Sequence, residues 1–217
     1  MASHVRMFHA RSPAAETGTA LRLSLTFYGI VYLVGVAVGV CLFLSLPPAL
    51  RHGLQVQLQG AFAAPGTHAA GASGAGGIAA GYQDAAVTVG IVLVLWLVGQ
   101  SPVGGGLAAI ILFLRAASLG LGLTLVPTVY GWRGAGFDLL AVVPWNILAA
   151  GACIVAGAAA GVYARRVRRD RGEHYSVRLY AVYCGVQLLC AAAVLCGGWL
   201  ESATAGRVAA FFALSPR

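Results

Sequence analysis

Charged residues are scarce in this 217-residue chain, and lysine is absent. Only 9% of the residues are charged, against roughly 25% in a typical soluble domain. All 14 basic residues are arginine, the net charge is +8, and six of the arginines lie in the short stretch 165–178. They do not form the aromatic-interleaved basic patch of a nucleic-acid-binding surface. No nucleic-acid partner is therefore predicted.

Residues that perform catalysis or bind metals are missing from the apolar parts of the chain. All five histidines lie outside the apolar segments, and all five cysteines lie inside them without metal-site spacing to a histidine. The chain has no HExxH or GxSxG motif. Its Gly-rich run at 102–106 lacks the Lys-Ser/Thr of a phosphate-binding loop. We therefore predict that the protein is not an enzyme and has no catalytic residue, metal or cofactor.

Carboxylates are also rare where ion transport would need them. Asp84, Asp138 and Glu201 are expected at the ends of apolar segments, and no pair of carboxylates lies inside one. Proton and ion transporters usually place such groups within the membrane. The sequence therefore gives little support to an ion-transporting role.

Hydrophobic residues make up 59% of the chain. Between Asp84 and Arg133, 48 residues contain a single charge, Arg115. This run is too long for a buried helix of a soluble fold. It is long enough for two membrane spans, which need about 20 residues each, with a break at 100–102. The pattern predicts an all-α, polytopic membrane protein.

Five transmembrane helices are predicted within a single membrane domain, 1–217. Their approximate limits are 24–46, 85–99, 104–126, 137–163 and 178–200. A flexible external loop is expected over 47–84, because its part from 64 to 81 is rich in Gly, Ala and Ser. The beginning of that loop, 50–58, is expected to form a short amphipathic turn on the membrane surface.

The distribution of arginine predicts the orientation of the bundle. A cluster between the fourth and fifth predicted spans consists of Arg165, Arg166, Arg168, Arg169 and Arg171. Because basic loops remain in the cytoplasm, the N-terminus is expected to be cytoplasmic and the C-terminus extracytoplasmic, in a multi-pass protein of the cell membrane. The cluster is also suited to anionic lipid headgroups, so membrane lipid is a predicted partner.

Arg115 lies near the middle of the third predicted span, where a charge is costly and is rarely left unpaired. Counted along antiparallel helices, Asn146 lies at a similar depth. Pro144 lacks an N–H and leaves a carbonyl of its own helix without a donor, and Trp145 offers a ring face. We expect Arg115 to be tied to this segment. The alternatives are that its side chain extends to the interface without a specific partner, or that Gln187 binds it.

Three stripes of small residues predict close helix contacts. Gly35 and Gly39 form a GxxxG pair, Ser118 and Gly122 lie on the same face as Arg115, and the fourth span carries Cys153, Gly157 and Gly161. Small residues let helices approach closely in lipid. Packing within the bundle is the favoured interpretation. Association with another chain, including a second copy in a homo-oligomer, remains open.

Four segments together resemble the stage II sporulation protein M family. They are Leu95–Gly99, Ile111–Gly120 around Arg115, Tyr130–Gly134, and Val143–Asn146 with its Pro-x-Asn. The resemblance covers roughly 84–163, and the family's five-span length agrees. The chain departs from the family pattern in having Ala116-Ala117 after the basic residue and Trp at 145.

The resemblance implies a role in endospore formation. The expected function is that of a non-catalytic scaffold in the mother-cell membrane at the septum. It would recruit or position the peptidoglycan-degrading stage II sporulation proteins D and P during engulfment of the forespore. The alternative is a permease-like membrane subunit of a transporter energised by a separate ATPase.

Overall fold

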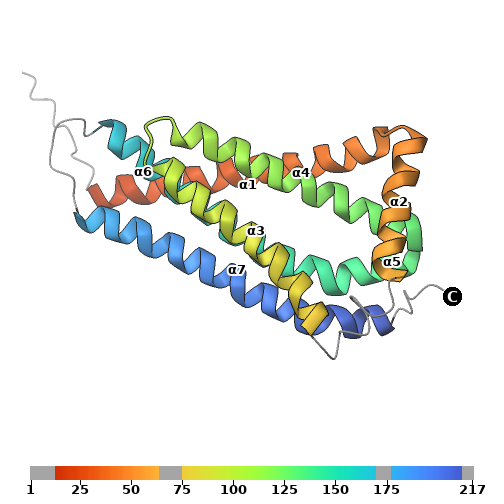
Figure 1. The fold of residues 1–217 in the computed structure, drawn as a ribbon. Helices are drawn as coiled ribbons and strands as arrows, with labels where there is room; N and C mark the ends of the chain where they lie inside the picture. The colour runs from red at the N-terminus through yellow and green to blue at the C-terminus, as the bar shows by residue number, and fades with distance from the viewer. Residues whose placement is uncertain (1–12, 64–74, 170–176, 212–217) are drawn as a thin grey trace, which may run out of the picture.

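The computed structural model describes residues 13–63, 75–169 and 177–211, and these residues form helices joined by short turns (Figure 1). In chain order the helices are α1 (Pro13–Ser45), α2 (Pro48–Ala63), α3 (Ala75–Gly99), α4 (Gly104–Tyr130), α5 (Trp132–Phe137), the π-helix η2 (Asp138–Val142), α6 (Val143–Arg169) and α7 (Val177–Phe211). No strand occurs among them. The all-helical prediction is confirmed for this part of the chain.

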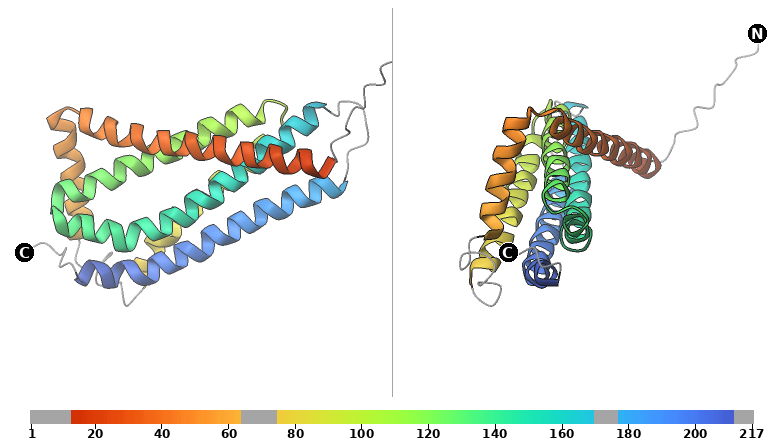
Figure 2. Two further views of the ribbon diagram at one scale, coloured as in Figure 1. Left: turned by 180° about the vertical axis from the view of Figure 1, so that it is seen from behind. Right: turned by 90° about the vertical axis from the view of Figure 1, so that its right-hand side faces the viewer.

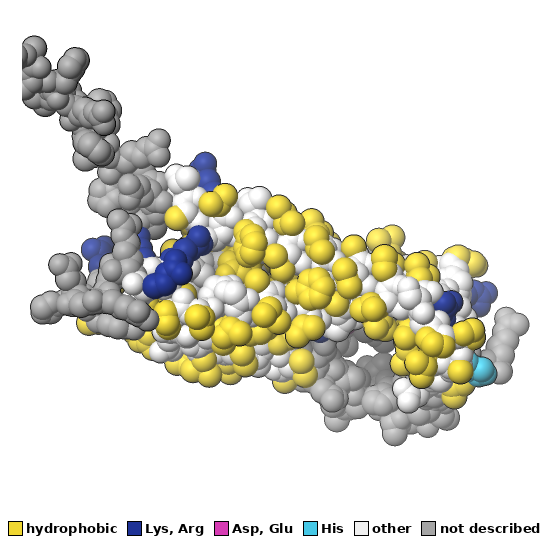
Figure 3. Space-filling view, turned by 90° about the horizontal axis from the view of Figure 1, so that it is seen from above, with side chains coloured by type: hydrophobic (Ala, Val, Ile, Leu, Met, Phe, Trp, Pro, Cys, Tyr) yellow, Lys and Arg dark blue, Asp and Glu magenta, His cyan; other side chains and the backbone are white. Residues whose placement is uncertain are grey.

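Four helical stretches are long and apolar enough to cross a membrane. They are Gly18–Ser45, Gly104–Tyr130, Trp132–Arg168 and Val177–Thr204. A shorter apolar helix covers Ala85–Gly99 and belongs to α3. The chain is therefore a multi-pass membrane protein, and the long apolar surface in Figure 3 agrees with burial in lipid.

Prolines set the first boundary of the bundle. Helix α1 ends at Ser45, just before Pro47 and Pro48. It ends there because helical geometry is disfavoured for a residue that precedes proline. Pro48 is also the first residue of α2, where a missing N–H costs nothing. Arg51 stabilises this corner, since its Nε donates to Leu46 O at 2.9 Å and its Nη2 donates to Leu44 O.

The structure differs from the expected loop over 47–84. Residues 48–63 form α2, which lies across one end of the bundle (Figures 1 and 2), and α3 begins at Ala75. The predicted amphipathic turn at 50–58 is thus part of a longer helix. The Gly/Ala composition did not prevent helix formation from 75 onward, because alanine is the strongest helix former. Residues 64–74 lie outside the described part of the chain.

A tight turn joins α3 and α4 at the opposite end. The amides of Gln100 and Ser101 donate to Leu97 O and Val98 O at 3.1 and 2.9 Å. A Cβ on Gly104 would collide with Val98 O, so the turn requires glycine there. This confirms the predicted helix boundary in the Gly-rich run.

The later helices run further than the sequence pattern indicated. α4 continues past Pro127 to Tyr130, and α7 extends to Phe211. Gly131 then reverses the chain with a φ of +60°, a left-handed conformation that glycine adopts without steric cost. From there α5, η2 and α6 follow one another directly.

Helix α6 is at the centre of the bundle and contacts α1, α3, α4 and α7. Its buried residues are mostly small: Ala149, Ala152, Cys153, Ala156, Ala158, Ala160 and Ala164. Small side chains allow four neighbours to approach one helix closely. The core of the protein is therefore built around this alanine-rich helix.

Candidate functional site

Helices α1 and α4 meet through glycine. A Cβ on Gly35 would come within 2.7 Å of Ala116 Cβ, and a Cβ on Gly39 would collide with Ala117 O. On the other side of the contact, Gly120 has no room for a side chain beside Val36 O. The predicted packing role of the GxxxG pair inside the bundle is confirmed.

Glycines of α6 make a second close contact, with Tyr28 of α1. Gly157 faces Leu112 and the Tyr28 ring, and a Cβ on Gly161 would lie 2.5 Å from the Tyr28 hydroxyl oxygen. That hydroxyl donates to Gly105 O at 2.9 Å. One tyrosine therefore joins α1, α4 and α6, and the α6 stripe lies in a helix contact inside the bundle.

The structure differs from the prediction for Ser118 and Gly122. The buried stripe of α4 consists of Gly104, Ala108, Leu112, Ala116 and Gly120. Ser118 is exposed and donates to Arg115 O of its own helix at 2.7 Å, and no atom lies within 4 Å of a Cβ placed on Gly122. These two residues were expected to pack because they form a stripe of small residues, but the face of α4 that they share with Arg115 lines a cleft instead.

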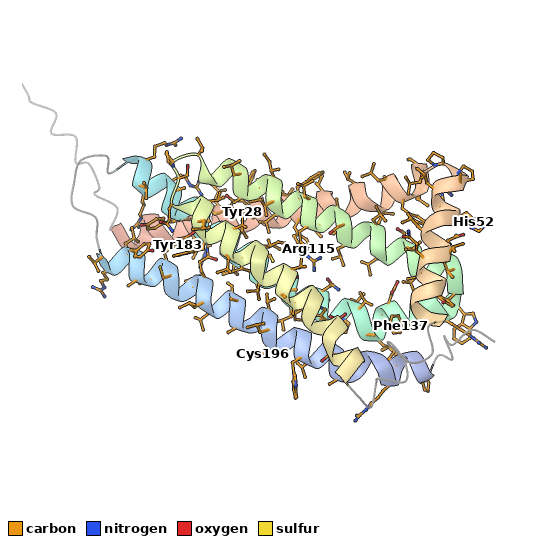
Figure 4. The ribbon with its side chains drawn as sticks, viewed as in Figure 1. Tyr28, His52, Arg115, Phe137, Tyr183 and Cys196 are labelled. Atoms are coloured by element: carbon orange, nitrogen blue, oxygen red, sulfur yellow. The ribbon has the colours of Figure 1, made fainter. Side chains whose placement is uncertain are left out.

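Arg115 is the twelfth of the 27 residues of α4, about 16 Å from one end and 22 Å from the other at 1.5 Å per residue. Figure 4 shows it midway along the bundle. Its Nη2 donates to Oγ1 of Thr88, on α3, at 3.0 Å, and Thr88 is fully buried. The guanidinium therefore bonds to a neighbouring helix, and it does so through a residue that the sequence did not single out.

Pro144 marks a change of helical geometry. The five residues Asp138–Val142 before α6 form a π-helix, in which the Val143 amide donates to Asp138 O. Pro144 cannot donate to the preceding turn, and the wider π turn accommodates that loss. Such single π turns often occur at functional sites.

The two residues after Pro144 face different neighbours. Asn146 is 8% exposed, and its Nδ2 donates to Val142 O at 2.9 Å. Trp145 is buried, and its ring fills the space that a side chain on Gly197 of α7 would occupy. Trp145 therefore packs towards α7, whereas the prediction had placed its ring at Arg115.

Gln187 binds α6. Its Nε2 donates to Ala156 O at 3.0 Å within the core. Nearby, the Tyr183 hydroxyl donates to Trp96 O at 2.8 Å, and its ring stacks on Tyr163 with centroids 4.4 Å apart. These contacts fix α7 against α3 and α6.

A partly open cleft of about 270 Å³ follows α4 from Arg115 towards the α2 end of the bundle. Its polar lining consists of Arg115, Ser118, Asp138, Asn146 and Glu201. Its apolar lining consists of Leu119, Leu123, Val126 and Val142, with Gly122 between them. The cleft is thus built from α4, η2, α6 and α7, and it brings Arg115 and Asn146 together as lining residues of one site.

Asp138 and Glu201 are the polar lining residues of this cleft that the sequence did not identify as site residues. Asp138 is 5% exposed, and its Oδ2 has no hydrogen-bond partner among the described residues. Glu201 reaches the same cleft from α7. Each is a lone carboxylate near the end of an apolar segment, and such residues are the sequence signal that could have identified the pair.

Arginines gather at the end of the bundle away from α2, which we call the arginine-rich end (Figure 3). The described side chains there are Arg22, Arg165, Arg166, Arg168 and Arg178. Arg165 donates to Gly161 O at 3.1 Å and, through Nη2, to Ser24 Oγ of α1. The side chain of Arg169 and all of Arg171, from the predicted cluster, lie outside the described residues.

No protein-family model, curated protein or solved structure matches this chain.

Proposed function

We propose that this protein is a non-catalytic membrane scaffold of the stage II sporulation protein M type. In this proposal it positions the peptidoglycan-degrading stage II sporulation proteins D and P at the septal membrane of a sporulating cell. The observation that carries the proposal is that two of the segments on which the resemblance rests lie together in the structure. Ile111–Gly120 and Val143–Asn146 both contribute to the cleft, and the Gly131 turn connects their helices.

The proposal includes five crossings of the membrane. Helix α3 has 25 residues, about 37 Å at 1.5 Å per residue, which exceeds a hydrocarbon core of about 30 Å. Along the chain, α1, α3, α4, α6 and α7 alternate in direction (Figure 1). With the arginine-rich end in the cytoplasm, the N-terminus is inside and the C-terminus outside.

Gene deletion in a sporulating host tests the scaffold. We expect the deletion strain to grow normally in the vegetative phase and to stop before the forespore membrane is engulfed, as seen by membrane-dye microscopy. Tagged protein purified from sporulating cells should carry the D and P proteins with it. Normal engulfment in the deletion strain would refute the proposal.

The cleft favours a second candidate, a permease-like membrane subunit energised by a separate ATPase. Charged and amide groups inside a transmembrane bundle commonly belong to substrate or ion pathways. An adjacent ATPase gene and ATP-dependent flux in proteoliposomes would support this candidate. Adjacent sporulation genes and no flux would support the scaffold.

A further inference from the structure

We propose that the cleft beside Arg115 binds a small organic cation, a compound with one ammonium group on an apolar body. The inference goes beyond the scaffold role and does not depend on it. It rests on the charges of the lining residues, on a buried carboxylate oxygen without a partner, on the apolar walls and on the π-helix that forms one side.

The charges of the lining residues favour a positive ligand. The cleft is lined by the two carboxyl groups of Asp138 and Glu201 and by the guanidinium of Arg115, so its net charge is −1 when all three groups are ionised. Asp138 is almost completely buried, with Oδ2 unpartnered in the described structure. A buried carboxylate is costly unless it is paired or hydrogen-bonded. An ammonium group supplies such a carboxylate with a positive charge and with hydrogen-bond donors.

The walls of the cleft favour an organic cation over a hydrated metal ion. Its apolar lining residues are Leu119, Leu123, Val126 and Val142. Gly122, which has no side chain, leaves open space among them. Hard cations such as calcium require six to eight oxygen ligands. In the described ranges, no three His, Cys, Asp or Glu side chains form a metal-binding group. An apolar body contacts these walls well, and a volume of about 270 Å³ limits it to a small compound.

Arg115 marks one end of the cleft along α4, with Asn146 among the lining residues, and its guanidinium limits the ligand to one positive charge. A second ammonium group extending past the carboxylates would approach the Arg115 guanidinium and be repelled. A neutral acceptor such as a hydroxyl or carbonyl group is compatible with that end. The site therefore selects monoamines over polyamines.

The π-helix gives independent support for a ligand site. Asp138 begins η2 and Val142 ends it, and both line the cleft. Regular α-helical geometry would place these two residues differently around the axis, so the wide turn sets the shape of the pocket. Turns of this kind are frequently found where ligands bind.

The experiment uses the full-length protein in lipid nanodiscs at pH 7 with benzylammonium as the probe. Benzyl alcohol is the neutral control of the same shape, spermidine is the polyamine control and benzoate is the anion control. Binding is measured as a saturable rise in melting temperature and by isothermal titration calorimetry. We expect saturable binding of benzylammonium alone.

Isosteric variants locate the binding. Asp138→Asn and Glu201→Gln should each weaken benzylammonium binding by about tenfold or more, as for truncation of a buried charge partner. Arg207→Gln, an exposed change on α7 near the same end, should leave affinity unchanged. Asp138→Asn removes a buried charge and should preserve folding, which the melting temperature without ligand reports.

Four results would overturn the proposal: no saturable binding of benzylammonium, equal binding of benzyl alcohol, selective binding of benzoate, or full affinity in the Asp138→Asn/Glu201→Gln double variant. None of these results would affect the scaffold role, which is measured by engulfment. Conversely, normal engulfment after gene deletion would leave the binding site in place.

Discussion

Arg115 Nη2 and Thr88 Oγ1 are 3.0 Å apart and join the middle of α4 to α3. Thr88 is fully buried, so its hydroxyl is a fixed acceptor for the guanidinium. Hydrogen bonds to charged groups contribute more than neutral ones, at about 1.5–3 kcal/mol. The pair therefore fixes the position of the charge that defines one end of the cleft.

Thr88→Val should lower the stability of the bundle. The variant removes the acceptor while keeping a similar shape, and we expect the free energy of unfolding to fall by about 1.5–3 kcal/mol. Denaturation of the purified protein in mixed micelles measures it. Thr26→Val is the matched control, because Thr26 is exposed and its hydroxyl donates to Arg22 O of its own helix. Equal effects of the two variants would show that the Arg115–Thr88 bond contributes nothing.

Gly39→Ala should separate α1 from α4. Its Cβ would collide with the backbone oxygen of Ala117, and overpacking of this kind costs about 1–3 kcal/mol. Gly29→Ala on the same helix is the control. Nothing lies within 4 Å of a Cβ there, and alanine is the better helix former by about 1 kcal/mol. The melting temperature should therefore fall for the first variant and stay or rise for the second.

Gly197→Ala should disturb the contact between α6 and α7. The added methyl group would occupy the place of the Trp145 ring, which is buried and has little room to move. We expect a lower melting temperature and a shift in tryptophan emission. Gly185→Ala on α7 provides the comparison, since its Cβ meets nothing within 4 Å. A Gly197→Ala protein as stable as Gly185→Ala would place the ring elsewhere.

Cysteine labelling tests the orientation. In a chain whose five cysteines are replaced by alanine, Gly18→Cys lies at the arginine-rich end and His52→Cys lies on α2 at the opposite end. An impermeant maleimide applied to intact cells should label His52→Cys and should label Gly18→Cys only after lysis. The reverse pattern would invert the protein in the membrane and place the arginine-rich end outside.

The sequence predicted the class of fold and several contacts, because apolar length and small-residue spacing are local properties. Gly35, Gly39, Gly157 and Gly161 lie in helix contacts as expected. The tight turn before Gly104 was also expected from its glycines. Helix α2 was missed beyond its first residues. The start of α3 was missed because Gly and Ala composition alone does not distinguish a linker from a helix.

The composition of the site was harder to predict. Counting residues along antiparallel helices placed Arg115 and Asn146 at similar depths, and both line the cleft. Depth does not give rotation about the axis, which changes by about 100° per residue in an α-helix. Rotation about the helix axes and the π-helix together determine three features that the sequence did not predict. They are the bond to Thr88, the contact of Trp145 with α7, and the presence of Asp138 and Glu201 in one cleft.

The central position of α6 has a consequence for biogenesis. Its alanine-rich surface contacts α7 as well as the helices made before it, so the bundle stays incomplete until the last helix has been synthesised and inserted. A nascent chain that stops before residue 177 leaves one side of α6 facing lipid, with Ala156 O lacking its bond from Gln187. We expect such truncated chains to be the form that membrane quality-control proteases recognise and remove.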